Sequence, residues 1–276
     1  ISDLRKMNSL IKNISNISQS PEQDNGFHVS PVFMFIALTM VIAGYLSYKN
    51  AAGARFWIFL FVTSGWVISL SLHEFGHALT AFHSGDRSVA DKGYLNLNPL
   101  KYTNVFMSIL LPVIFLMMGG IGFPGGAVYI NTKAIKNKRR QSLVSAAGPL
   151  ATAGFALVLL LPFFFGFDKA AGMDQNAFWS GWALLTFLQI TALLFNLLPV
   201  PGLDGFGIIE PFLPEEVMVK LRKIGGLFIL AIFFLLFSDS PVSRGFWMLI
   251  RRTAEIFDLN MLLVSNGFRL FQFWHF

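Results

Sequence analysis

Long apolar stretches with almost no charged residues constrain the fold of this chain more than any other feature. A helix of about 20 apolar residues crosses a bilayer, and five runs approach or reach that length: Pro31–Tyr48, Phe56–Phe82, Leu143–Phe167, Phe178–Leu198 and the shorter Ile224–Phe237. Charged residues make up 13% of the chain, against about 25% in a soluble domain. The sequence therefore predicts an all-α polytopic membrane protein with about five to six transmembrane helices.

The rest of the chain divides around these runs. Residues 1–28 are polar and predict a tail, residues 29–240 a membrane-embedded domain, and residues 241–276, which mix charged and aromatic side chains, an interfacial tail. The run Met107–Met118 is short and contains a proline, so we expect it to be re-entrant and to precede a strand-like stretch at Ala127–Ile130. The net charge of +6 gives no indication of nucleic-acid binding, and the lack of cysteine excludes thiolate ligands and disulfides.

The residues His73-Glu-Phe-Gly-His77 lie near the end of the second apolar run, in which Glu74 is the single formal charge. An H-E-x-x-H motif places two imidazoles on one helix face, beside a carboxylate, and this pattern is typical of zinc hydrolases. Ionisable residues within a membrane span are costly and mark functional sites. The motif therefore predicts a metal site within the membrane, with His73 and His77 as two of the ligands.

A catalytic zinc ion usually keeps three protein ligands and one open position, so one ligand is missing. No Glu occurs between Glu74 and Glu210, which excludes a Glu on the next helix. In an unbroken helix His83 points about 240° away from His77. Asp204 follows an apolar span among Pro and Gly residues, where it either projects towards a metal or is a solvated loop residue. The incomplete ligand set in the membrane favours the first interpretation.

Three segments, considered together, resemble the site-2 protease family of intramembrane zinc metalloproteases. The first is the His73–His77 motif with the following Gly85-Asp86 and Leu95-Asn-Leu-Asn-Pro99. The second is Ser145-Ala-Ala-Gly-Pro149, and the third is Asn196–Gly205, which is similar to the pattern N-x-x-P-x-P-x-L-D-G. The match covers roughly residues 56–210. Standalone bacterial members carry Pro-Val-Pro-Val where this chain has Ala127–Ile130, so substrate presentation there is less well defined.

The resemblance implies a zinc endopeptidase that cleaves single-span membrane proteins. One zinc ion would be bound by His73, His77 and Asp204. Glu74 would be the general base that takes a proton from water and passes it to the leaving amine. Asn196 would help to hold the substrate, although an interhelical hydrogen bond explains an asparagine in a span equally well.

The alternative is a membrane metal-binding or carrier protein that uses the same ligands without proteolysis. A carrier is expected to have further ionisable residues in its other spans. None occurs in Pro31–Tyr48 or Leu143–Phe167, which favours the protease.

Topology provides a separate test, because groups that bind one zinc ion must lie at the same membrane face. Two crossings, Leu143–Phe167 and Phe178–Leu198, between His77 and Asp204 satisfy this condition. The membrane face that contains the metal site then carries twice as many Lys and Arg residues as the opposite face. Positive residues favour the cytoplasmic side. The sequence therefore predicts a multi-pass protein of the cell membrane with its active site towards the cytoplasm.

Overall fold

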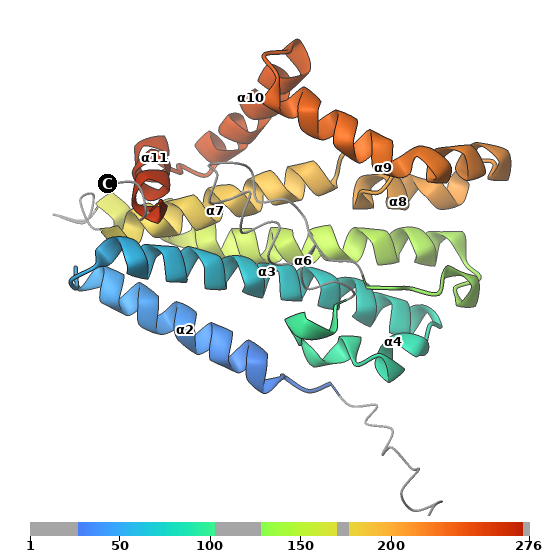
Figure 1. The fold of residues 1–276 in the computed structure, drawn as a ribbon, viewed down its shortest axis with the longest axis horizontal. Helices are drawn as coiled ribbons and strands as arrows, with labels where there is room; N and C mark the ends of the chain where they lie inside the picture. The colour runs from blue at the N-terminus through green and yellow to red at the C-terminus, as the bar shows by residue number, and fades with distance from the viewer. Residues whose placement is uncertain (1–26, 103–127, 170–176, 273–276) are drawn as a thin grey trace, which may run out of the picture.

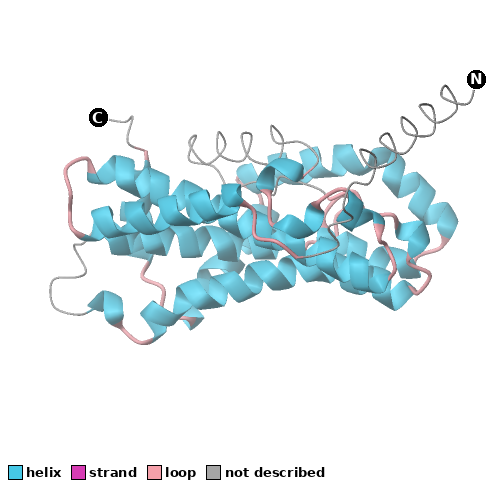
Figure 2. Cartoon of the chain, turned by 90° about the horizontal axis from the view of Figure 1, so that it is seen from below, coloured by secondary structure: helices cyan, strands magenta, loops and turns pink. Residues whose placement is uncertain are grey.

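The computed structural model describes residues 27–102, 128–169 and 177–272, which are largely helical and contain no strand (Figures 1 and 2). The α-helices are α2 (Pro31–Tyr48), α3 (Ala54–Ser84), α4 (Ser88–Asp91), α6 (Lys138–Phe164), α7 (Ala177–Asn196), α8 (Asp204–Ile209), α9 (Glu215–Phe237), α10 (Pro241–Ile256) and α11 (Met261–Phe271). Single 3-10 turns are η1 (Tyr94–Asn96), η2 (Pro99–Lys101), η4 (Thr132–Ala134), η5 (Phe167–Lys169) and η6 (Glu210–Phe212). The predicted all-α class is confirmed for these ranges.

Four of the described helices are long and apolar enough to cross a membrane, namely α2, α3, α6 with its extension to Lys169, and α7. The predicted fifth span, Ile224–Phe237, is the second part of α9 and is not among them. The first turns of α9 carry acidic and basic residues, and the apolar part that remains is shorter than the about 20 residues that cross a bilayer. The predicted re-entrant run Met107–Met118 and almost all of the polar tail lie outside the described residues.

Helices α3 and α7 form the centre of the bundle. Helix α3 packs against α2, α6 and α7, while α7 also packs against α6 and α11, and the four long helices lie side by side in Figure 1. Buried apolar side chains such as Ile58 and Phe61 of α3 and Leu184 and Leu188 of α7 fill the space between them. The central helices therefore carry the core, and α2 lies at the outside.

The outer helices expose apolar side chains. On α2, Met34 and Phe35 are more than half exposed, and so are Leu157 and Val158 on α6. Exposed apolar surface on this scale is unusual for a soluble protein and matches what lipid covers around a helical bundle. Together with the four candidate spans, it makes this chain a multi-pass membrane protein.

The C-terminal region forms two helices. Helix α11 packs against α7 and α3, and its residues Leu263, Val264 and Phe271 are almost completely buried. Helix α10 contacts α7 and α9 at the edge of the bundle (Figure 1). The interfacial position expected for residues 241–276 stays a prediction, and the packing shows that α11 is part of the helical core.

The chain on each side of the undescribed segment 103–127 returns to the same part of α3. Tyr102 and Val128 lie in one buried apolar cluster with Ala78 and Ala81 of α3. The strand-like stretch expected at 127–130 is not a strand over its described part, residues 128–130. The backbone N–H of Val128 is bonded by the carboxylate of Glu74 rather than by a neighbouring strand.

Candidate metal centre

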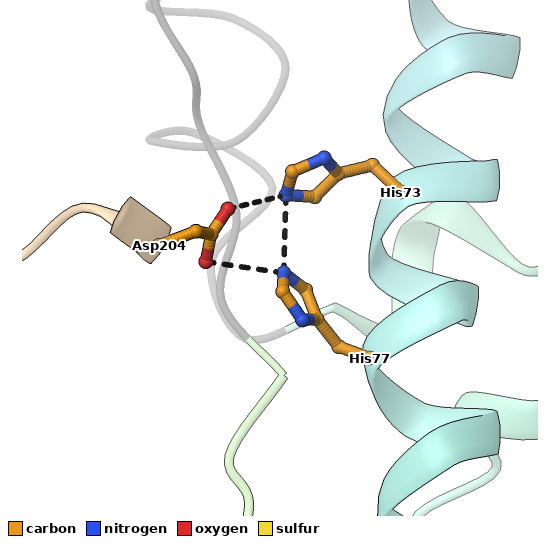
Figure 3. Close-up of side chains that lie close together, drawn as sticks. All are labelled: His73, His77 and Asp204. Carbon is orange, nitrogen blue, oxygen red and sulfur yellow. Dashed lines mark hydrogen bonds and ion pairs between the residues drawn. The ribbon is translucent and has the colours of Figure 1, made fainter. Parts of the chain in front are cut away.

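His73 and His77 lie one turn apart on α3, near its C-terminal end, and both side chains are buried. Their Nε2 atoms face each other at 3.1 Å. Asp204, the first residue of α8, lies opposite, with Oδ2 at 3.1 Å from Nε2 of His73 and Oδ1 at 3.2 Å from Nε2 of His77 (Figure 3). The structure therefore brings Asp204 to two histidines that lie more than 120 residues earlier in the sequence, and the three form the one His/Asp/Glu cluster among the described residues that could hold a metal ion.

The turn between α7 and α8 directs Asp204 towards α3. Helix α7 ends at Asn196, and α8 begins at Asp204 after a short turn that contains two prolines. Gly205, the second residue of α8, is required after this turn, because a Cβ atom there would lie 2.2 Å from the carbonyl oxygen of Leu197. The backbone thus folds back closely on the end of α7, and this places the Asp204 carboxylate at the imidazoles.

Helix α6 holds the far sides of both imidazoles. Nδ1 of His77 lies 2.7 Å from the carbonyl oxygen of Val144, which can only accept a hydrogen bond. In the neutral ring Nδ1 therefore carries the proton and Nε2 offers its lone pair, as a metal ligand requires; in the protonated ring Nε2 instead donates to Asp204. Nδ1 of His73 lies 3.0 Å from Oγ1 of Thr152. Such bonds fix the orientation of histidine rings that bind metals.

The donor atoms fit a zinc ion. Zinc takes nitrogen and oxygen ligands at about 2.0–2.1 Å in a tetrahedron, so two of its ligand atoms lie about 3.3 Å apart. The separations of 3.1–3.2 Å among the two Nε2 atoms and the Asp204 oxygens are close to this value. Three protein ligands leave one position of a tetrahedron open, as in catalytic zinc sites.

Space for the two imidazoles depends on Gly148 of α6. A Cβ atom at this position would lie 2.2 Å from Nε2 of His77 and 2.7 Å from Nε2 of His73. Real Cβ atoms do not approach other heavy atoms so closely. A glycine is thus needed where α6 passes the ligand cluster.

Asp204 carries a negative charge in this arrangement. Its burial alone would raise the pKa of the carboxyl group. The charge on His77 and the hydrogen bonds with His73 and His77 outweigh burial, so the pKa lies well below its ordinary value. Asp204 is therefore in the anionic form that binds a metal ion.

Glu74 lies beside the cluster and is not part of it. Its carboxylate is 3% exposed, and Oε2 accepts a hydrogen bond from the N–H of Val128 at 3.0 Å. The phenol of Tyr102 donates to the carbonyl oxygen of Ser71 at 3.1 Å. Burial raises the pKa of Tyr102, and the charge of Glu74 raises it further, so Tyr102 stays protonated. Glu74 is therefore a buried side chain that lies beside the His73, His77 and Asp204 cluster without being one of its members.

The other predicted residues lie as follows. His83 is exposed at the end of α3, where its ring bonds the carbonyl oxygen of Leu79, and it is outside the cluster. Asn196 is buried at the last position of α7 and is also outside the cluster. A cavity of about 510 Å³ opens next to the site between the start of α6 and the region of α8 and α9. Its lining includes Val144, whose carbonyl bonds His77, and Ser145.

Sequence reasoning did not predict three contacts of the site residues, namely those of Val128 with Glu74, Val144 with His77 and Thr152 with His73. Two of these contacts are made through backbone atoms, which every residue has, so no residue type could have identified them. Thr152 had a signal, because it lies one helical turn after Gly148 and therefore on the same face of α6.

The helices are long enough to cross a membrane, and two buried imidazoles meet one partly buried carboxylate. Together these features define a membrane protein with a zinc-type donor set. No protein-family model and no solved structure matches the chain. Curated proteins do match it. The chain is 42% identical over 250 residues to "Putative zinc metalloprotease Rip2" of Mycolicibacterium smegmatis, an alignment that covers 89% of this chain and 94% of that protein.

Two further relatives agree with this match. The protein of the same name from Mycobacterium tuberculosis is 38% identical over 249 residues, with 89% of this chain and 94% of that protein covered. "Putative zinc metalloprotease YwhC" of Bacillus subtilis is 35% identical over 167 residues, with 57% of this chain and 71% of that protein covered. The chain belongs to the zinc metalloprotease family of these relatives, which the H-E-x-x-H motif had indicated.

Proposed function

We propose that this protein is an intramembrane zinc metalloprotease of the site-2 protease type, which hydrolyses peptide bonds of single-span membrane proteins. The observation that carries the proposal is the convergence of His73, His77 and Asp204 beside a buried Glu74 in a membrane-spanning bundle. The names of the relatives support the zinc-dependent peptidase chemistry. Cleavage within the membrane is inferred from the position of the donor set near the ends of spanning helices.

In this proposal His73, His77 and Asp204 hold one zinc ion through Nε2, Nε2 and a carboxylate oxygen. When bound, the zinc ion acidifies water and polarises the scissile carbonyl group. The Val144 carbonyl and the Thr152 hydroxyl keep the two rings in the orientation that directs Nε2 towards the metal. The anionic carboxylate of Asp204 adds the negative charge that a divalent cation favours.

Glu74 acts as the general base. Its Oε2 is held by the N–H of Val128, and Oε1 is the atom we assign to proton transfer. The carboxylate takes the proton of the attacking water and delivers it to the nitrogen of the leaving amine. The burial of Glu74 keeps bulk water away from this exchange. Asn196, at the end of α7, is the proposed hydrogen-bond partner of the substrate.

The site is proposed to open towards the cytoplasm of the cell, where the positive-inside rule places the face richer in Lys and Arg. The cavity beside the site provides a route for water and for the released peptide end. Gln141, Ser145 and Glu210 are among its lining residues, and such polar side chains suit a hydrated path.

A cleavage assay tests the proposal. The purified chain is reconstituted with candidate single-span membrane proteins, and wild type is compared with Glu74→Gln. This change removes the base but keeps the size of the side chain, so turnover should fall by about 10²–10⁴-fold while zinc stays bound. Glu216→Gln, the same change at an exposed position of α9, is the control and should cleave like wild type.

Two results would contradict the proposal. Full cleavage by the Glu74→Gln variant excludes Glu74 as the base. If the wild-type protein binds zinc but cleaves none of the single-span proteins, and Glu74→Gln changes its zinc affinity, the metal-carrier alternative replaces the protease.

A further inference from the structure

The Glu74 carboxylate is held by a part of the chain that lies 54 residues away in the sequence. Its Oε2 accepts the N–H of Val128 at 3.0 Å, and both residues are buried, at 3% and 8% exposure. A glutamate side chain has three rotatable bonds, so a fixed donor on one oxygen determines where the other oxygen points. A general base must lie within about 2.6–3.2 Å of the proton that it takes, and its orientation therefore affects catalysis directly.

The side chain of Val128 and the residue that follows it are both held in place. Val128 packs into the buried cluster formed with Ala78 and Ala81 of α3. One residue further on, the carbonyl oxygen of Tyr129 accepts a hydrogen bond from Nζ of Lys92 at 3.0 Å, and the same ammonium lies 4.4 Å from the centre of the Tyr129 ring. The Val128 amide is therefore a positioned group with little freedom to follow the carboxylate.

A second buried carboxylate anchors the same segment. Asp86 is 1% exposed, and its Oδ2 accepts the N–H of Asn131 at 2.7 Å. Its Oδ1 accepts the N–H and the hydroxyl of Ser88, at 3.1 and 2.6 Å. Asp86 thus ties residues 128–131 to the corner that follows α3. The two carboxylates of this region hold the segment at two backbone amides, three residues apart.

We propose that Val128 is a positioning residue for the general base, whose backbone N–H orients the Glu74 carboxylate, and that the contacts of Asp86 and Lys92 with residues 128–131 keep this donor in place. The inference rests on the proposed function, because it gives Glu74 the role of the base. A purely structural contact would hold the segment against α3 without affecting the rate of the chemical step. The positioning role predicts that kcat depends on the Val128 amide. A purely structural contact predicts that kcat is unchanged and that the Val128 side chain affects only stability.

Val128→Pro removes the donor, and Val128→Ala keeps the donor while shortening the side chain. A hydrogen bond to a charged group contributes about 1.5–3 kcal/mol, so losing it should lower kcat on the order of tenfold to a hundredfold. The zinc content of Val128→Pro should stay at the wild-type level, because this amide bonds Glu74 and none of the three metal ligands. Val128→Ala should restore most of kcat.

Hydrogen exchange provides a readout that needs no activity and no variant of Val128. Exchange of the Val128 amide is measured in wild type, Glu74→Ala and Glu74→Gln. Glu74→Ala removes the acceptor and should speed exchange by about tenfold or more, whereas Glu74→Gln keeps an amide oxygen as acceptor and should retain most of the protection.

The outcomes separate this inference from the proposed function. A wild-type kcat in Val128→Pro, an equal loss of kcat in Val128→Pro and Val128→Ala, or unchanged exchange in Glu74→Ala would each overturn the positioning role. If Val128→Pro does not fold, kcat of Lys92→Met decides, because this change removes the contact that holds the donor through the carbonyl oxygen of Tyr129; a wild-type kcat in Lys92→Met would then overturn the positioning role. If the wild-type chain cleaves no membrane substrate, the protease proposal fails, and the exchange result still reports on the contact between Glu74 and Val128.

Discussion

A methyl group added at Gly148 should prevent zinc binding while leaving the bundle folded. The new Cβ atom of Gly148→Ala would lie 2.2 Å from Nε2 of His77, more than 1 Å inside the 3.4 Å at which ordinary contact begins, and it would crowd His73 as well. Overpacking of this kind lowers the free energy of unfolding by about 1–3 kcal/mol. Replacing a glycine within a helix by alanine raises it by about 1 kcal/mol and offsets part of this loss. The fold should therefore survive, with both imidazoles displaced.

The displacement determines the effect on the metal. In metal sites the distances between metal and ligand atoms stay within about 0.2 Å of their usual values. A displacement of both imidazole rings by roughly 1 Å is several times larger than this tolerance. Substitutions in the groups that only orient ligands already cost about 10–100-fold in metal affinity. We therefore expect Gly148→Ala to weaken zinc binding by at least about 100-fold, and cleavage should be lost with it.

The assay is a competition titration of zinc against a chromophoric chelator, with circular dichroism to check the helical content. Gly154→Ala is a matched control on the same helix, because its Cβ atom would meet nothing within 4 Å. This control should bind zinc like wild type. A zinc affinity of Gly148→Ala within a few fold of wild type would refute the close packing of α6 against the two imidazoles.

Two further predictions follow from the same geometry. Thr152→Val removes the partner of Nδ1 of His73 and should weaken zinc binding by about 10–100-fold, whereas Thr152→Ser keeps a hydroxyl and should stay close to wild type in the same titration; equal affinities of the two variants would contradict a role for this bond. The end of α3 and the start of α6 lie together at the site, so single cysteines at Lys101 and Lys138 should react with a membrane-impermeant thiol reagent from one face, and a cysteine at Lys49 from the other. Labelling of Lys101 and Lys138 from opposite faces would exclude the proposed topology.

The sequence was most informative where one residue type can do only one thing. A run of about 20 apolar residues is long enough to cross a bilayer and is too apolar to be exposed to water. Four of the predicted spans correspond to helices of the structure. The boundaries were less accurate. Helix α6 begins at Lys138, five residues before the predicted span, because Asn137 caps its first turn by accepting N–H bonds from Arg139 and Arg140. Hydropathy does not detect a polar first turn.

The convergence of His73, His77 and Asp204 could be predicted because helix geometry and the need for a third ligand left few candidates. His73 and His77 had to share a face, and the structure brings Asp204 to them while His83 points elsewhere. The surroundings of the cluster depend on tertiary packing that single-sequence patterns do not contain. The contacts of Val144 and Val128 with the site are made by backbone atoms, and they arise only once α6 and residues 128–131 have packed against α3.

One zinc ion is proposed to be bound by His73, His77 and Asp204. Elemental analysis of the purified, detergent-solubilised chain tests it most directly, because it measures the zinc content of each variant without a substrate. We expect about one zinc ion per wild-type chain, loss of most of it in His77→Ala and Asp204→Asn, and full retention in His83→Ala, which removes a histidine outside the cluster. Zinc content unchanged by Asp204→Asn, or lost in a folded His83→Ala variant, would exclude this ligand set.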